Sequence, residues 1–114
     1  MADCLFCRIV RKEIPAKTVY EDGKFLAFED IHPQAPVHIL LIPKTHFASL
    51  NEAPDEAGGL LGEALLRARE IAREKGIGTS GFRLVLNTAR DSGQDVFHLH
   101  FHILGGRRMT WPPG

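Results

Sequence analysis

A run of alternating histidines near the C-terminus constrains the fold more than any other part of the sequence. His98, His100 and His102 alternate with apolar residues as far as residue 104. A period of two is typical of a β-strand with one buried face, so the run predicts a strand over residues 96–104. The three imidazoles would then line one face of a sheet, roughly 6.5–7 Å apart along the strand.

The rest of the chain predicts further strands, with helices set apart from them. Four segments alternate or are rich in β-branched residues, at 18–21, 24–29, 37–42 and 82–87. In the third, His38 is the one polar residue of an apolar strand. Apolar residues at helical spacing predict a helix over residues 4–13 and a longer one over 54–75. Because short turns join the strands, we expect one α+β domain over residues 1–114, built on an antiparallel sheet and ending in a tail at 105–114.

Composition narrows the classes of partner and location. Lysine and arginine together number 14, as do aspartate and glutamate, so the formal charge is zero and no broad basic field is expected to attract nucleic acid. No stretch approaches the ~20 apolar residues that span a membrane, and no secretory signal precedes the first helix. We therefore expect a cytoplasmic protein whose Cys4 and Cys7 are reduced.

Three interpretations of the histidine run are open from the residues alone. The rings could lie on a solvated sheet face, chelate a metal such as zinc, or take part in phosphoryl transfer. A neutral imidazole is a nucleophile near pH 7, and its neighbours can bind phosphate oxygens. The loop before the strand favours the third interpretation, because Gly93 permits a close ligand, and Gln94 and Asn87 offer neutral donors.

Several segments together resemble the histidine-triad family in its Hint branch. The matching segments are 11–16, 30–31, 34–38, 42–44, 93–94, 98–104, 105–107 and 111–114. They extend over nearly the whole chain. The resemblance implies the histidine-triad (HIT) fold, with about five antiparallel strands and two main helices.

The resemblance also implies an activity. Hint-like proteins are purine nucleoside phosphoramidases, which cleave the bond between phosphorus and an amine through a nucleotidyl-histidine intermediate. Carried onto this chain, His100 is the nucleophile, and His102 binds or protonates at the phosphate. His38 belongs to the same proton network, and His98 is the first histidine of the triad.

The same resemblance implies where the nucleotide binds. Asp30 would accept hydrogen bonds from the ribose hydroxyls, although a loop aspartate often only caps a turn. The base would lie among apolar side chains that could equally be plain core: Phe6, Ile9, Phe28 and Ile31. The phosphate would be held by Asn87, Gly93, Gln94 and the backbone at Asp95.

Asp95 departs from the animal members of the family, which have a serine at this position that is thought to help the amine leave. A carboxylate aimed at the phosphate would repel it, so we expect only the backbone N–H of Asp95 to contact the ligand. Bacterial relatives often carry an acidic residue here.

Cys4 and Cys7 form a C-x-x-C pair, which is half of a zinc site or simply two buried thiols. In some family members with this pair, zinc is completed by the histidine of the Pro-Lys-x-His segment and by the first histidine of the triad. These are His46 and His98 here, so the resemblance implies a structural zinc that plays no part in catalysis.

The family forms homodimers in which two sheets become continuous, and the resemblance places Trp111 near the partner's site. Purine nucleoside monophosphate derivatives are the expected ligands, with neither nucleic acid nor membrane as a partner. Two other functions are open: hydrolysis of dinucleoside polyphosphates, and a nucleotide- or zinc-binding role with incidental catalysis. The segments 105–107 and 111–114 argue against the first of these.

Overall fold

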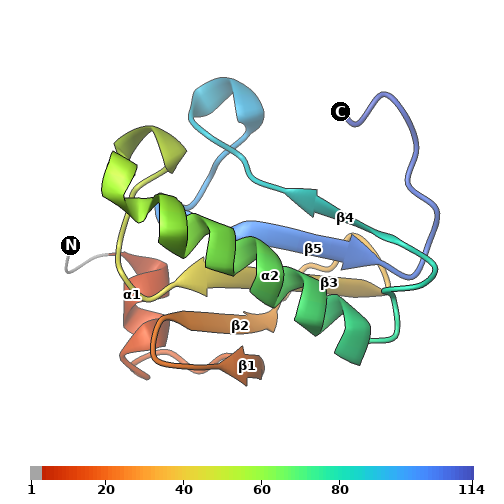
Figure 1. The fold of residues 1–114 in the computed structure, drawn as a ribbon, viewed down its shortest axis with the longest axis horizontal. Helices are drawn as coiled ribbons and strands as arrows, with labels where there is room; N and C mark the ends of the chain where they lie inside the picture. Colours follow the sequence, from red (N-terminus) through yellow and green to blue (C-terminus); the bar gives the residue numbers. More distant parts are fainter. Residues whose placement is uncertain (1–3) are drawn as a thin grey trace.

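Residues 4–114 are described by a computed structural model, and within them five strands form one antiparallel sheet (Figure 1). The strands are β1 (Thr18–Glu21), β2 (Phe25–Glu29), β3 (Val37–Pro43), β4 (Phe82–Val85) and β5 (Phe101–Gly105). Their order across the sheet is β1-β2-β3-β5-β4, and every neighbouring pair is antiparallel. The predicted α+β architecture is therefore confirmed, and β1 and β4 are the edge strands.

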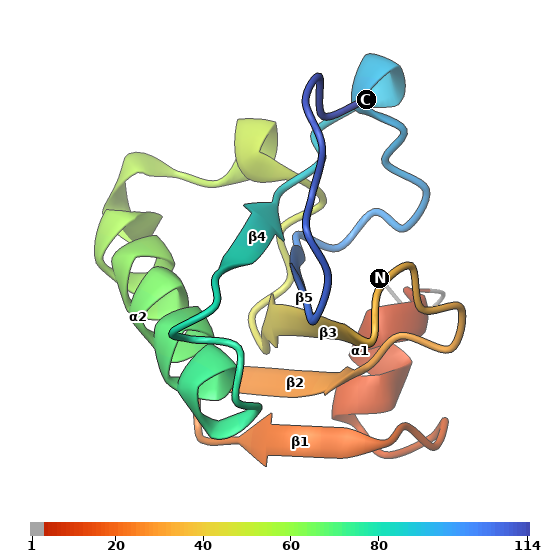
Figure 2. The same ribbon diagram turned by 90° about the vertical axis from the view of Figure 1, so that its right-hand side faces the viewer.

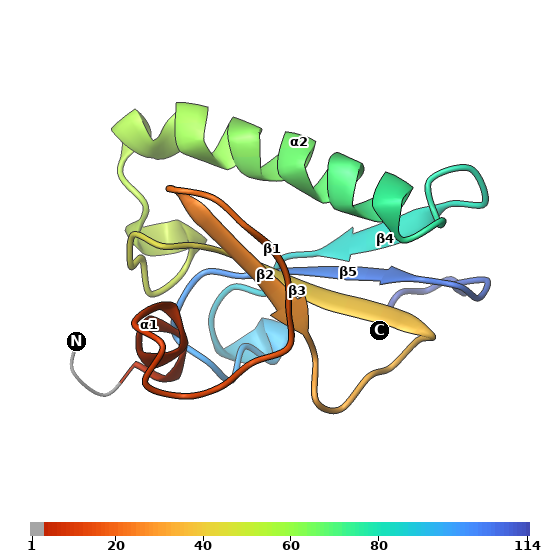
Figure 3. The ribbon, with the colours of Figure 1, turned by 90° about the horizontal axis from the view of Figure 1, so that it is seen from below.

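The two α-helices cover opposite faces of the sheet. The long helix α2 (Gly58–Glu74) lies across one face, and the short helix α1 (Leu5–Val10) lies on the other (Figures 2 and 3). Three 3₁₀ turns complete the described part of the chain, at Leu50–Glu52, Asp55–Ala57 and Arg90–Ser92. No helix in residues 4–114 is both long and apolar enough to cross a membrane.

Strand alternation divides the core into two clusters, one under each helix. In β2, Phe25 and Ala27 belong to the cluster under α2, whereas Leu26 and Phe28 belong to the cluster that includes residues of α1. Both faces of this central strand are thus buried, and each large apolar side chain removed from water contributes about 1.5–3 kcal/mol. The sheet is therefore packed between two apolar layers.

The predicted strand over residues 96–104 is wrong at its beginning, because β5 starts only at Phe101. Its neighbour β3 pairs Leu41 with Phe101 and ends at Pro43, which has no N–H to continue the ladder. The backbone N–H of Leu99 donates instead to the carbonyl of Phe47, at 2.7 Å. His98 and His100 therefore lie in the irregular segment that leads into the strand.

The predicted first helix over residues 4–13 is also too long. Lys12 takes a left-handed conformation with φ +65°, and the N–H of Glu13 donates to the carbonyl of Arg8 at 2.9 Å. This is the hydrogen bond of a Schellman C-cap, which stops α1 at Val10. Lysine is not the glycine that usually marks such a cap, so the sequence did not reveal it.

The remaining predicted boundaries differ by smaller amounts. The long helix begins at Gly58 because the expected first turn from residue 54 is a 3₁₀ turn. The strand predicted over 82–87 ends at Val85.

Candidate functional site

A cavity of about 480 Å³ opens on the α1 side of the sheet. Eight residues selected from the sequence line it: Phe6, Ile9, Phe28, Asp30, Ile31, Asp95, His100 and His102. Its walls come from α1, the end of β2, the loop before β5 and β5 itself. Residues far apart in the sequence are therefore gathered around one space large enough for a small ligand.

Strand register brings the histidines together. Leu40 of β3 is opposite His102 of β5, and His38 is opposite Leu104, so His38 and His102 are diagonal neighbours on one face. That face is the one that carries the apolar cluster with α1, since Leu40 belongs to that cluster. His38, Leu40 and His102 therefore share the α1 side of the sheet.

The ring of His100 is held by a backbone carbonyl. Its Nδ1 lies 2.8 Å from the carbonyl oxygen of His98, and a carbonyl can only accept, so Nδ1 carries the proton. The lone pair of a neutral ring is then on Nε2. Phe6 packs against this ring edge-to-face, with centroids 5.2 Å apart. His100 is thus a buried imidazole with one fixed tautomer, and it lines the cavity.

His38 and His102 form a hydrogen-bonded pair. The backbone N–H of Gln34 donates to Nδ1 of His38 at 3.0 Å, which leaves the His38 proton on Nε2. That Nε2 lies 2.9 Å from Nδ1 of His102 and 3.4 Å from Oδ2 of Asp30, both of which can accept. Neutral His102 therefore carries its own proton on Nε2.

Burial keeps these rings neutral. Desolvation lowers the pKa of His102 to about 4, with further lowering by the neighbouring His100 and His38. Desolvation also lowers the pKa of His38, which the Asp30 carboxylate opposes. A neutral pair of rings can donate directed hydrogen bonds at pH 7 without carrying charge.

Asp30 caps a turn and also borders the cavity. Its Oδ1 accepts the backbone N–H of His32 at 2.8 Å, which is an Asx turn, and the residue also lines the cavity. Beside it, the rings of Phe6 and Phe28 meet edge-to-face with centroids 5.4 Å apart. Both aromatic rings are largely buried in the cluster on the α1 side, yet both border the cavity.

Three of the residues expected at the phosphate are not among those that line the cavity: Asn87, Gly93 and Gln94. The amide of Gln94 is buried and bonded internally: its oxygen accepts the N–H of Ala89 at 2.8 Å, and its nitrogen donates to the carbonyls of Ala48 and Val96. Its side chain shapes the loop. Asp95, one residue later, does reach the cavity.

Other lining residues were not predicted. They are Leu5, Ile14, Pro15, Ala16, Lys17, Glu29, Leu40 and Val96. Most of these side chains are apolar, so no functional motif in the sequence singles them out. Half of them belong to the segment 14–17, which the fold places at the cavity. Lys17 brings a cation to the edge, 3.6 Å from the Glu29 carboxylate.

The cysteine pair and two histidines form a second cluster. Cys4, Cys7, His46 and His98 each offer one ligand atom, and these atoms lie within 4.8 Å of one another. Sulfur-to-nitrogen distances are 3.3 Å from Cys4 to His98 and 3.4 Å from Cys7 to His46, and the two Nδ1 atoms are 3.2 Å apart. The sequence-based set of four is therefore brought together.

The donors of this cluster fit a tetrahedral zinc ion. Zinc with usual bond lengths separates sulfur and nitrogen ligands by about 3.6 Å and two nitrogens by about 3.3 Å. Nε2 of His98 donates to the carbonyl of Pro43 at 2.8 Å, so its Nδ1 presents a lone pair to the cluster. The Sγ of Cys4 also accepts the N–H of Cys7, at 3.3 Å, as a thiolate ligand would.

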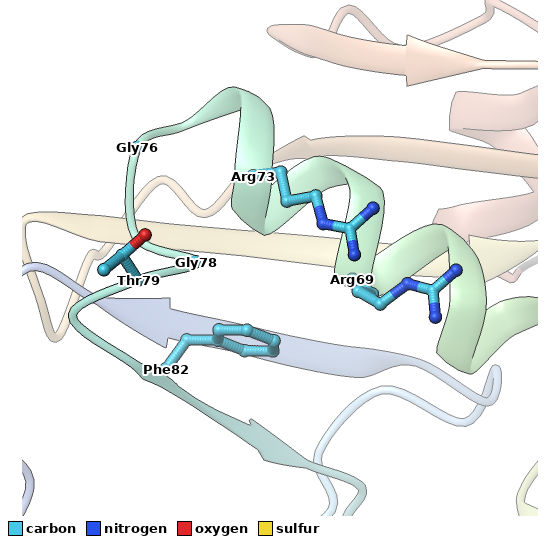
Figure 4. A pocket seen from close by; sticks show the side chains of 6 residues that line it. All are labelled: Arg69, Arg73, Gly76, Gly78, Thr79 and Phe82. Carbon is cyan, nitrogen blue, oxygen red and sulfur yellow. The ribbon is translucent and has the colours of Figure 1, made fainter.

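A second hollow of about 370 Å³ lies between α2 and β4 (Figure 4). It is lined by Arg69, Arg73, Gly76, Gly78, Thr79 and Phe82. Arg73 already pairs with Glu70 at 2.7 Å. This hollow contains no imidazole or thiol, so the histidine cavity is the candidate site for chemistry.

Comparison with known proteins identifies the family of this chain. The family model described as HIT domain matches residues 11–109. An uncharacterized HIT-like protein of Synechocystis is 56% identical over 112 residues, which is 98% of this chain and 97% of that protein. Protein HitA of Neisseria gonorrhoeae is 54% identical over 105 residues, or 92% of this chain and 97% of its own.

Solved structures agree with the fold. A HIT family hydrolase from Legionella pneumophila superposes with a TM-score of 0.96 at 52% identity, and the match covers 98% of this chain and all (100%) of that one. A histidine triad protein from Clostridium difficile gives a TM-score of 0.94 at 44% identity, over 96% of each chain.

Proposed function

Because the chain belongs to the HIT domain family, we propose that it hydrolyses the phosphorus–nitrogen bond of purine nucleoside 5′-monophosphoramidates. The observation that carries the proposal is His100, whose Nδ1 is occupied by the His98 carbonyl and whose Nε2 is left with the lone pair in a ring that lines the cavity. The relative from Legionella that bears the name hydrolase supports the reaction class.

In the proposed reaction, Nε2 of His100 attacks phosphorus. A bond between phosphorus and Nε2 forms as the bond to the amine nitrogen breaks, and the amine takes a proton from solvent. The N–H of His102 donates to a phosphate oxygen and stabilises the charge that develops there. Water then attacks phosphorus, releases a proton to solvent and displaces His100, which frees the nucleoside monophosphate.

The nucleoside fits the remaining features of the cavity. Asp30 keeps Oδ2 for the ribose hydroxyls, since Oδ1 is already used by the backbone of His32. Phe6, Phe28 and the exposed Ile31 provide apolar surface for a purine ring. Asp95 also lines the cavity, and its backbone N–H, rather than its carboxylate, would contact the phosphate.

The test is hydrolysis of an adenosine phosphoramidate by the native protein and by His100→Ala, with far-UV circular dichroism to show that both are folded. We expect the variant to lose at least about a thousandfold in kcat, the scale of removing a nucleophile. Unchanged turnover in His100→Ala would reject this nucleophile. Preferred hydrolysis of a dinucleoside polyphosphate would reject the substrate class, and tight nucleotide binding without turnover would favour a binding protein.

A structural zinc is part of the proposal, held by Cys4, Cys7, His46 and His98. Four protein ligands leave no open position, so the ion would tie α1 to the sheet and supply no Lewis acid. We expect about one zinc per chain by elemental analysis and a lower Tm after chelation or in Cys7→Ser. A metal-free protein whose Tm is indifferent to chelators would contradict this.

A homodimer through β4 completes the proposal. The edge of β4 has no strand partner in residues 4–114, and α2 exposes Leu65 and Leu66, 49% and 48% accessible, one turn before Arg69. A second copy added at this edge would extend the sheet and cover these leucines. Light scattering should give twice the chain mass, and a monomer in both the native protein and Leu66→Lys would rule the interface out.

A further inference from the structure

Arg107, just after β5, is hydrogen-bonded to the loop between β2 and β3. The Arg107 guanidinium donates from Nε and Nη2 to the carbonyl oxygen of Gln34, at 3.1 and 3.0 Å. The preceding Gly106 has φ +88°, and a Cβ there would lie 2.9 Å from Cβ of Pro36. The loop can approach this closely only because residue 106 is glycine.

The residue that Arg107 holds, Gln34, also contacts the His38 ring. Gln34 is held at its carbonyl by Arg107, and its own N–H donates to Nδ1 of His38 at 3.0 Å. The other side of the His38 ring faces Oδ2 of Asp30 and Nδ1 of His102. His38 is therefore placed between a fixed donor on one nitrogen and two acceptors on the other.

This placement permits only one neutral tautomer of His38. With the proton on Nδ1, the ring would point a donor at the Gln34 N–H and lose its bond to Asp30, although Nε2 could still accept a proton shared with His102. With the proton on Nε2, all three contacts are satisfied. The direction of the pair then follows, since Nδ1 of His102 accepts and its proton must be on Nε2.

We propose that Arg107 and the backbone N–H of Gln34 are positioning residues that fix the tautomer of His38 and so keep Nε2 of His102 as a hydrogen-bond donor. Arg107 does not touch the cavity; it acts by holding Gln34. The inference rests on the proposed function only for the use that His102 makes of this proton, because the tautomers themselves are properties of the free protein.

The test is a ¹⁵N NMR measurement of the histidine rings in the ligand-free protein. In the native chain, Nδ1 of His38 should give the shift of an unprotonated nitrogen and Nε2 that of a protonated one. Arg107→Met removes both donors at similar length and should move the two shifts towards each other. Arg107→Lys keeps one donor and should lie between, while Arg108→Met is the matched control for losing a neighbouring exposed arginine.

Turnover gives a second readout that a general loss of folding would not produce. In Arg107→Met we expect kcat to fall about three- to tenfold with KM unchanged, the scale of one ordinary net hydrogen bond. A native His38 protonated on Nδ1 would overturn the proposal even if no variant folds. So would Arg107→Met with native shifts and native kcat. Altered shifts without phosphoramidase activity would reject the proposed function and leave the tautomer assignment standing.

Discussion

Acid should destabilise this protein through His102, and the size of the effect follows from its environment. Burial lowers the pKa of this ring from 6.5 to about 4 in the folded chain. Between these pH values the unfolded chain binds a proton there that the folded chain does not, so the free energy of unfolding rises with pH and is lost as the pH falls. At ~1.4 kcal/mol per unit the full loss would be about 3 kcal/mol, and we expect about 2 because solvent screens a partly exposed ring.

The assay is urea unfolding by circular dichroism at intervals from pH 7 to pH 4, on the native protein and on His102→Gln. The native protein should lose about 2 kcal/mol more than the variant over this range, with the difference appearing below pH 6.5. Other buried histidines whose pKa is lowered, His38 and His98, act in both proteins and largely cancel. His32→Gln controls for loss of an exposed histidine. Parallel curves for native and His102→Gln would refute the burial argument.

Three substitutions test packing and backbone strain elsewhere in the fold. Gly105→Ala should cost about 1–3 kcal/mol in urea unfolding, because its Cβ would lie 2.6 Å from Cδ1 of Ile77, and Ile77→Val in the same chain should recover part of the loss. Ala89→Gly should stabilise by about 1 kcal/mol, since φ +67° with ψ −171° is a region for glycine, and a lower Tm would contradict this. Gln94→Leu should cost about 2–4 kcal/mol, because three backbone groups lose the hydrogen bonds that the buried amide makes with them; near-native stability would mean that water replaces the amide.

Period-two patterns predicted the sheet well because each central strand buries two different faces. In β3 the alternation that separates His38 from Ile39 is the alternation between the two core clusters. The pairing of His38 with His102 needed the strand order, which a pattern within one strand does not contain. The resemblance to a known family implied that proximity, and the register explains it.

The sequence was a poorer guide where side chains act on the backbone rather than on a face. Gln94 looked like a phosphate ligand because an amide beside a glycine offers donors, but a buried amide is held first by the nearest backbone groups. Arg107 gave no site prediction of its own, since its contact with Gln34 crosses between two loops. The extent of α1 depended on a left-handed lysine, which has no reliable pattern.

Because β5 starts only at Phe101, the three alternating histidines are not simply three equivalent rings on one face of a strand. Because the ladder stops at Pro43, the segment before Phe101 is free to turn the His98 ring into the Cys4–Cys7–His46 cluster. The backbone carbonyl of His98 accepts the Nδ1–H of His100 at 2.8 Å. One residue thus offers its ring to the proposed zinc site and its backbone carbonyl to the proposed nucleophile. A regular strand would have paired that carbonyl with a neighbouring strand, so the irregularity at residues 98–100 is what fixes the tautomer of His100.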